Sequence, residues 1–139
     1  MTAPPVPSDR LRFDSFVLER LPNGSCHARV DLALRSDDRY SGKCDGLTSP
    51  AGELRCAAQA CVNALQDFVG KAVTFELLGV KAVRAFDATV VIVSVAAHGE
   101  PNGARLVGSV LTDSDPARGA ALAVLNATNR VLGNRFFMR

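Results

Sequence analysis

Apolar residues predict two similar helices, one in each half of the chain. Within residues 49–70, apolar side chains from Leu54 to Phe68 recur at three- and four-residue steps, which places them on one face of a helix. Residues 115–133 repeat this arrangement without a gap. The residues Ala60, Val62, Asn63, Ala64, Val69 and Gly70 align in turn with Ala123, Leu125, Asn126, Ala127, Leu132 and Gly133. The chain therefore carries an internal repeat.

Both helical segments begin with residues that favour a helix start. Pro50 and Pro116 fall at the first helical position, where the missing N–H costs nothing. Side chains just before them supply caps, from Ser49 in the first segment and from Ser114 or Asp115 in the second. The aligned glycines stand where a helix commonly ends in a left-handed conformation.

Alternation of apolar and polar residues predicts strands before each helix. The expected strands cover residues 11–20, 27–35, 39–45, 72–86, 89–97 and 105–112. Gly79 falls inside the fourth, where a glycine indicates a bend or a β-bulge. The fifth lies in a continuous apolar run, residues 88–97, which predicts a buried strand at the centre of a sheet.

The order of elements, three strands and a helix repeated once, predicts the fold class. We expect an α+β protein built from a duplicated βββα unit with pseudo-twofold symmetry, in which helices pack on one face of antiparallel sheets. The predicted organisation is a disordered lead over residues 1–11, one domain over residues 12–133 with halves 12–70 and 71–133, and a short tail over residues 134–139.

Composition and charge exclude several functional classes. The 139 residues are 47% apolar and 22% charged, as in ordinary soluble domains. Lys and Arg number 16 against 14 Asp and Glu, interspersed to a net charge of +2, so we expect no nucleic-acid partner. The longest apolar run is far short of the ~20 residues of a membrane span. The first ten residues lack a secretory signal, so we expect a cytoplasmic protein without a membrane partner.

No residue cluster predicts a reaction. The four cysteines include no CxxC pair, and only His27 and His98 are available to complete a metal site. We expect the cysteines to be small, buried and reduced, with a disulfide or metal role as the alternative. Neither histidine has a nucleophile and a carboxylate at a recognisable spacing, and no phosphate-binding loop is present. We therefore expect no catalytic residue, no metal and no cofactor.

The two loops before the helices are candidate ligand sites. They combine free hydroxyls with the N–H groups of a helix start, which together can hold a carboxylate or another small anion. Ordinary helix capping explains the same residues and stays open as the alternative. The candidate ligand-binding residues are Asp45, Gly46, Thr48, Ser49, Thr112, Asp113 and Ser114.

Asparagines in the middle of both helices are candidate interface residues. Asn63 and Asn126 occupy matching positions of the repeat, and Asn129 follows one turn later. Asparagine is a poor helix former. Either these side chains face solvent, or they form hydrogen bonds across a pseudo-twofold or dimer contact.

The duplicated unit resembles the C-terminal regulatory domain of 2-isopropylmalate synthase and citramalate synthase. The resemblance covers roughly residues 13–133, and the stretches that carry it are 30–34, 42–50, 60–65, 73–83, 86–88 and 123–130. In that family a small-residue loop precedes the first helix, and the last helix ends in Asn-Arg, here Asn129-Arg130. Asp45-Gly46 and residues 111–115 depart from the family's more glycine-rich loops.

The resemblance implies a stand-alone regulatory or dimerisation module. Because the family's catalytic barrel and metal motif are absent, no condensation chemistry carries over. We expect a homodimer that binds a small metabolite, such as a branched-chain amino acid, and that acts on a partner enzyme. The alternative is a homo-oligomeric structural or adaptor protein without a ligand, and an enzyme ranks third.

Overall fold

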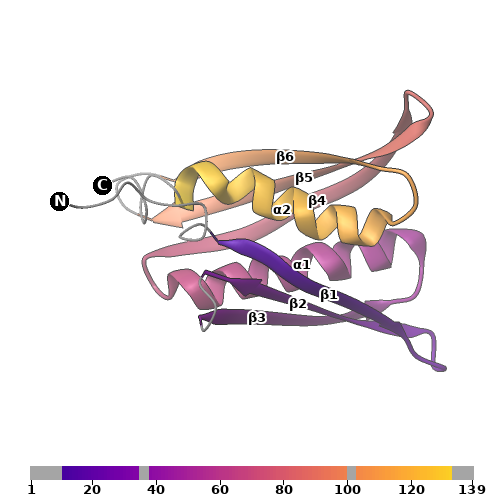
Figure 1. The fold of residues 1–139 in the computed structure, drawn as a ribbon, viewed down its shortest axis with the longest axis horizontal. Helices are drawn as coiled ribbons and strands as arrows, with labels where there is room; N and C mark the ends of the chain where they lie inside the picture. The colour runs from indigo at the N-terminus through magenta and orange to yellow at the C-terminus, as the bar shows by residue number, and fades with distance from the viewer. Residues whose placement is uncertain (1–10, 35–37, 100–102, 133–139) are drawn as a thin grey trace.

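The computed structural model describes residues 11–34, 38–99 and 103–132. Its elements follow the predicted order of three strands, a helix, three strands and a helix (Figure 1). They are β1 (Arg12–Arg20), β2 (Ser25–Ala33), β3 (Arg39–Leu47), α1 (Pro50–Val69), β4 (Val73–Ala85), β5 (Ala88–Gly99), β6 (Ala104–Thr112) and α2 (Pro116–Leu132). The prediction of an α+β fold with a duplicated βββα unit is confirmed. Apart from Leu11, the predicted lead and tail lie outside the described residues.

Each half forms its own three-stranded antiparallel sheet. The N-terminal sheet has the order β1-β2-β3 and the C-terminal sheet the order β4-β5-β6, so every strand pairs with its neighbour in sequence. A register shift between Leu77 and Gly79 confirms the predicted irregularity in β4. Phe86 and Asp87 form the tight turn between β4 and β5 with φ of 56° and 60°, as two-residue hairpin turns require.

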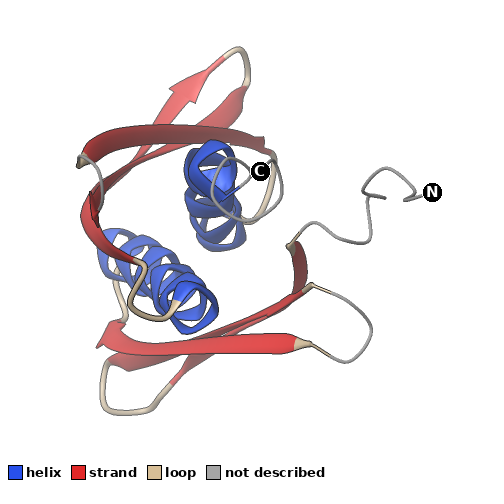
Figure 2. Ribbon diagram, turned by 90° about the vertical axis from the view of Figure 1, so that its left-hand side faces the viewer, coloured by secondary structure: helices blue, strands red, loops and turns tan. Residues whose placement is uncertain are grey.

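The helices lie between the two sheets, which form the outer layers (Figure 2). α1 packs on β2 and β3, and it also contacts α2 and β4 of the other half. The expectation of a single apolar face on α1 is therefore wrong, because neighbours surround the helix on several sides. Its buried residues are Leu54, Cys56, Ala57, Ala58, Ala60, Cys61, Val62, Ala64, Leu65 and Val69.

The helix ends follow the predicted chemistry. The hydroxyl of Ser49 accepts a hydrogen bond from the Gly52 N–H at 3.0 Å, and Pro50 opens α1. Of the two candidate caps of α2, Asp115 does the capping, because its carboxylate accepts from the Arg118 N–H at 3.1 Å. Gly70 ends α1 with a φ of 62°, which favours glycine, but its ψ of −123° differs from the predicted left-handed conformation. Gly133, predicted to end the second helix, lies outside the described residues. Neither helix, within the described part of the chain, has the length and apolar character needed to cross a membrane.

The pseudo-symmetry extends to one close contact in each half. A Cβ atom on Gly42 of β3 would lie 2.1 Å from the Ala60 carbonyl oxygen of α1. A Cβ atom on Gly108 of β6 would lie 2.2 Å from the Ala123 carbonyl oxygen of α2. Since the two alanines align in the sequence repeat, each half brings its helix backbone directly onto the last strand of its sheet.

The apolar strand at the centre of the C-terminal sheet is buried on one face only. Val91, Val93 and Val95 point to the helices and have no exposed surface. Ile92 lies on the opposite side of the strand and is 38% exposed. The continuous apolar run predicts that β5 is buried on both faces. Within this chain, however, no helix or strand covers the outer face of β5 among the described residues.

Candidate functional site

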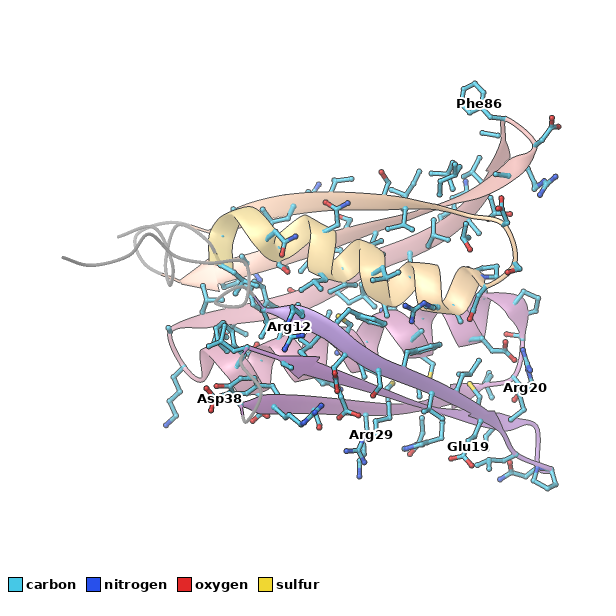
Figure 3. The ribbon with its side chains drawn as sticks, in the orientation of Figure 1. Arg12, Glu19, Arg20, Arg29, Asp38 and Phe86 are labelled. Atoms are coloured by element: carbon cyan, nitrogen blue, oxygen red, sulfur yellow. The ribbon has the colours of Figure 1, made fainter. Side chains whose placement is uncertain are left out.

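The two pre-helix loops lie at the same end of the molecule. Both helices start at the end where Arg20 is found (Figures 1 and 3). The Arg20 guanidinium donates two hydrogen bonds to the Glu53 carboxylate of α1, at 2.7 and 2.9 Å. The Glu53 carboxylate, through this hydrogen bonding and through its charge, raises the pKa of Arg20. Arg20 thus joins the end of β1 to the first turn of α1.

Capping and strand contacts engage the hydroxyls of the first loop. Thr48 Oγ1 donates to the Ser25 carbonyl at 2.6 Å, and Ser49 caps α1. The Asp45 carboxylate lies 2.6 Å from His27 Nδ1. Gly46 packs beneath α1, because a Cβ there would lie 3.3 Å from the Cys56 Cβ. In this loop the structure shows helix capping and strand contacts, which is the alternative to a ligand site.

The second loop has the same character. Thr112 Oγ1 accepts from the Asp115 N–H at 3.2 Å, so it supports the residue that caps α2. Asp113 and Ser114 are exposed to solvent. The structure therefore places all seven predicted ligand-binding residues at one end of the molecule, and uses the three hydroxyls of Thr48, Ser49 and Thr112 to hold the backbone.

Two of the three predicted interface asparagines, Asn63 and Asn126, bind the last strand of their own half. Asn63 Nδ2 donates to the Lys43 carbonyl at 2.8 Å, and Asn126 Nδ2 donates to the Ser109 carbonyl at 3.1 Å. Each of these carbonyls directly follows the close-packed glycine of its strand. Asn129 is exposed. A role for the three asparagines in a contact between copies stays a prediction.

Three cysteines gather where α1 covers the N-terminal sheet. Cys56 Sγ donates to the Cys44 carbonyl at 3.0 Å, and Cys26 shares the inner face of the sheet with Cys44. Burial is the main cause that raises the pKa of both the Cys44 and Cys56 thiols. Burial also raises the pKa of Cys61, in the interior of α1, to about 12. These thiols are protonated at neutral pH and are weak nucleophiles.

The structure describes all four cysteines as free thiols. Three of them are buried and Cys44 is half-buried, in keeping with the interpretation as small core residues. Within residues 11–34, 38–99 and 103–132, no group of three or more His, Cys, Asp or Glu side chains is arranged to hold a metal ion.

The outer face of the N-terminal sheet is largely polar, and its side chains pair across the strands, which the sequence did not predict. Cross-strand rows on this face include Glu19–His27–Asp45, Val17–Arg29–Lys43 and Ser15–Asp31–Ser41. Glu19 and Arg29 point away from the helices (Figure 3). Only the strand register brings these side chains together.

Asp31 sits at the centre of this polar face. Ser15 donates to its carboxylate at 2.8 Å, Arg29 Nε donates at 3.2 Å, and Ser41 also donates to it. Partial burial, the largest single influence, raises the pKa of Asp31, but the donors Ser41, Ser15 and Arg29 together outweigh it and hold the pKa below its usual range. The ionised carboxylate therefore stabilises the fold.

Asp31→Asn should lower the free energy of unfolding by about 1 kcal/mol near pH 7, because the substitution removes a charge that accepts several hydrogen bonds. The folded-state pKa of Asp31 is lowered, so its stabilisation is complete above about pH 4 and is lost as the pH falls through the folded value. Urea denaturation at about pH 7 and about pH 3.5 measures the difference. Asp113→Asn, on an exposed loop, is the control. A loss that is equal at both pH values would contradict the assignment.

The outer face of the C-terminal sheet is apolar where its counterpart is polar. Gly42 and Gly108 occupy equivalent positions, and Asp45 and Leu111 each follow their glycine by three residues. The row Glu19–His27–Asp45 of the N-terminal sheet therefore corresponds to the row Val83–Val90–Leu111 of the C-terminal sheet. Six of the nine large apolar side chains that are exposed within the described residues belong to this sheet or its hairpin. We call this set the apolar face; its members are Leu78 (39% exposed), Val83 (38%), Phe86 (95%), Ile92 (38%), Val107 (65%) and Leu111 (62%).

Comparison with known protein families and curated proteins identifies no relative of this chain. The interpretation of the apolar face therefore rests on the molecule's own geometry.

Proposed function

We propose that this chain is a non-catalytic regulatory or dimerisation module that acts by pairing with a second copy of itself. The apolar face is the observation that supports this most directly. The fold does not require apolar residues there, because the same positions of the N-terminal sheet carry Glu19, His27 and Asp45. Exposed apolar patches rimmed by polar residues mark protein contacts.

Catalysis has little support by comparison. The two histidines each contact a single carboxylate: His27 lies 2.6 Å from Asp45, and His98 lies 3.1 Å from Glu76. Both pairs stand on exposed sheet faces. The protonated thiols beneath α1 are poor nucleophiles.

The binding of a small metabolite is the second part of the proposal, and its support is weaker. A ligand at the pre-helix loops would take hydrogen bonds from groups that now cap the helices, such as Ser49 and Thr112. The expected ligand class stays that of the branched-chain amino acids and related 2-oxo or hydroxy acids. An effector that binds the dimer better than the monomer would shift the population toward the dimer.

Two measurements on the full chain test the proposal. Sedimentation over a range of concentrations should give a mass of twice 14.7 kDa. A thermal-shift screen with the same acids should reveal a ligand, since about 100 times its Kd stabilises the folded state by about 2.7 kcal/mol. A dimer without any shift favours the module that works by pairing alone. A monomer at every concentration would overturn the proposal.

A further inference from the structure

The apolar face is complementary to itself about one particular axis. In a twofold dimer with the sheets face to face, the axis lies in the plane between them. An axis parallel to β5 places β5 opposite β5 of the partner, and β4 opposite β6 of the partner. Every cross-strand row then keeps its position along the strand direction. Rows at one end of the face then meet the same rows of the second copy.

This arrangement matches apolar residues with apolar residues. In the row Val83–Val90–Leu111, Val83 of one copy faces Leu111 of the other. Leu78 lies in the β-bulge of β4 next to Ser94 of β5, and Val107 of β6 pairs with Ser94 from the other side. Leu78 of one copy therefore faces Val107 of the other. Ile92 of one copy faces Ile92 of the other. Each face thus contributes six apolar side chains to the contact: Leu78, Val83, Val90, Ile92, Val107 and Leu111.

The charged residues on the same face also match. Glu76 and Arg105 flank Ala96 in one row, so Glu76 of each copy faces Arg105 of the other. Lys81 and Ser109 flank Ile92, so Lys81 faces a hydroxyl rather than a like charge. The dimer thus contains two pairs of opposite charge, Glu76 with Arg105 of the other copy in each direction, at the polar end of the contact.

The other in-plane axis gives a mismatched contact. An axis perpendicular to β5 that crosses it at Val93, the middle of the face, reverses the strands and places the row Val83–Val90–Leu111 on the row Glu76–Ala96–Arg105. Burying a carboxylate and a guanidinium against aliphatic side chains without partners costs several kcal/mol. Of these two axes, the one along β5 therefore fits the charges and the apolar residues of the face.

We propose that two copies of this chain pair through the outer faces of their C-terminal sheets, with β4 of each copy over β6 of the other. The inference rests on the proposed function, because it presupposes that the chain pairs with itself. Sheets that pack in this way lie about 10 Å apart with their strands nearly aligned. Phe86 extends from the tip of the β4–β5 hairpin, away from the body of the molecule (Figure 3), and adds apolar surface at the edge of the contact.

Charge reversal at the polar end tests this geometry. In a dimer of the Glu76→Arg variant, the introduced arginine of each copy faces Arg105 of the other copy. In a dimer of the Arg105→Glu variant, the introduced glutamate of each copy faces Glu76 of the other copy. Each single variant should weaken the dimer about tenfold, because like charges then meet across the contact. The double variant E76R/R105E should pair as tightly as the original protein. Lys43→Glu, an exposed change on β3 of the N-terminal sheet, should leave the Kd unchanged.

Mixing the two single variants gives the sharper result. A copy with Arg at both positions meets a copy with Glu at both positions, so native mass spectrometry should find the mixed dimer in excess over either homodimer. A dimer of the original protein that neither reversal weakens, or a mixture without preference, overturns this geometry but leaves the proposed function standing. A monomeric original protein overturns both.

Discussion

Replacing Gly42 with alanine should lower the free energy of unfolding by about 3 kcal/mol or more. The new Cβ would lie 2.1 Å from the Ala60 carbonyl oxygen and 2.3 Å from the Ala64 amide nitrogen. Both are backbone atoms of α1, so the clash is relieved only if the helix moves away from β3. That movement would also break the hydrogen bond from Asn63 to the Lys43 carbonyl. Urea denaturation followed by circular dichroism measures the loss.

Gly79→Ala is the matched control for this substitution. Gly79 is also a strand glycine, but a Cβ there has no neighbour within 4 Å, so its free energy of unfolding should change by less than about 0.5 kcal/mol. Gly108→Ala should behave like Gly42→Ala, since its Cβ would lie 2.2 Å from the Ala123 carbonyl oxygen. Equal stability of the Gly42 and Gly79 variants would show that the helix does not lie directly on β3.

Placing lysine at both Val107 and Leu111 should abolish pairing at concentrations where the original protein is a dimer. These are the two most exposed sheet residues of the apolar face, at 65% and 62%. In the proposed dimer each lysine would be buried against Leu78 or Val83 of the other copy without a partner. We expect the Kd to rise by at least about 100-fold, since an unpaired charge in an interface centre costs several kcal/mol.

The control for this double variant is Val17→Lys. Val17 is 51% exposed and points outward from β1 of the N-terminal sheet, opposite Arg29, so its replacement should leave the mass in solution unchanged. Circular dichroism checks that both variants fold, which separates a lost contact from a lost structure. If the Val107 and Leu111 variant stays dimeric, the apolar face is not the contact.

The repeat and the helix starts were predictable because their causes are local. Pro50 and Pro116 have one favoured position in a helix, and the caps beside them need only neighbouring residues. Gly79 indicated the β4 irregularity, which the register between β4 and β5 confirms. Such features depend on residues close together in the sequence.

The packing of each helix on its sheet was not predictable from the aligned repeat. Asn63 and Asn126 are 63 positions apart, whereas Gly42 and Gly108 are 66 positions apart. The gap-free alignment that relates the helices therefore does not relate the strands beneath them. Only the folded chain shows that each asparagine reaches the carbonyl that follows its glycine.

In the candidate site, too, local features were predictable from the sequence and features that depend on strand register were not. Capping at Ser49 and Asp115 followed from local sequence, and the structure shows both side chains accepting from backbone N–H groups. The apolar face depends on the register of three strands, which brings Val83, Val90 and Leu111 into one row. In the sequence these residues are ordinary members of apolar strands. Comparison with the polar rows of the other sheet is what distinguishes them.

The pairing of every strand with its neighbour in sequence also bears on how the chain folds. No sheet hydrogen bond joins the two halves among the described residues, so each sheet forms from short hairpin loops whose closure costs little entropy. The long-range part of folding is then the docking of α1 against α2 and β4. We therefore expect side-chain packing in the middle of the molecule, rather than the search for strand register, to limit the rate of folding.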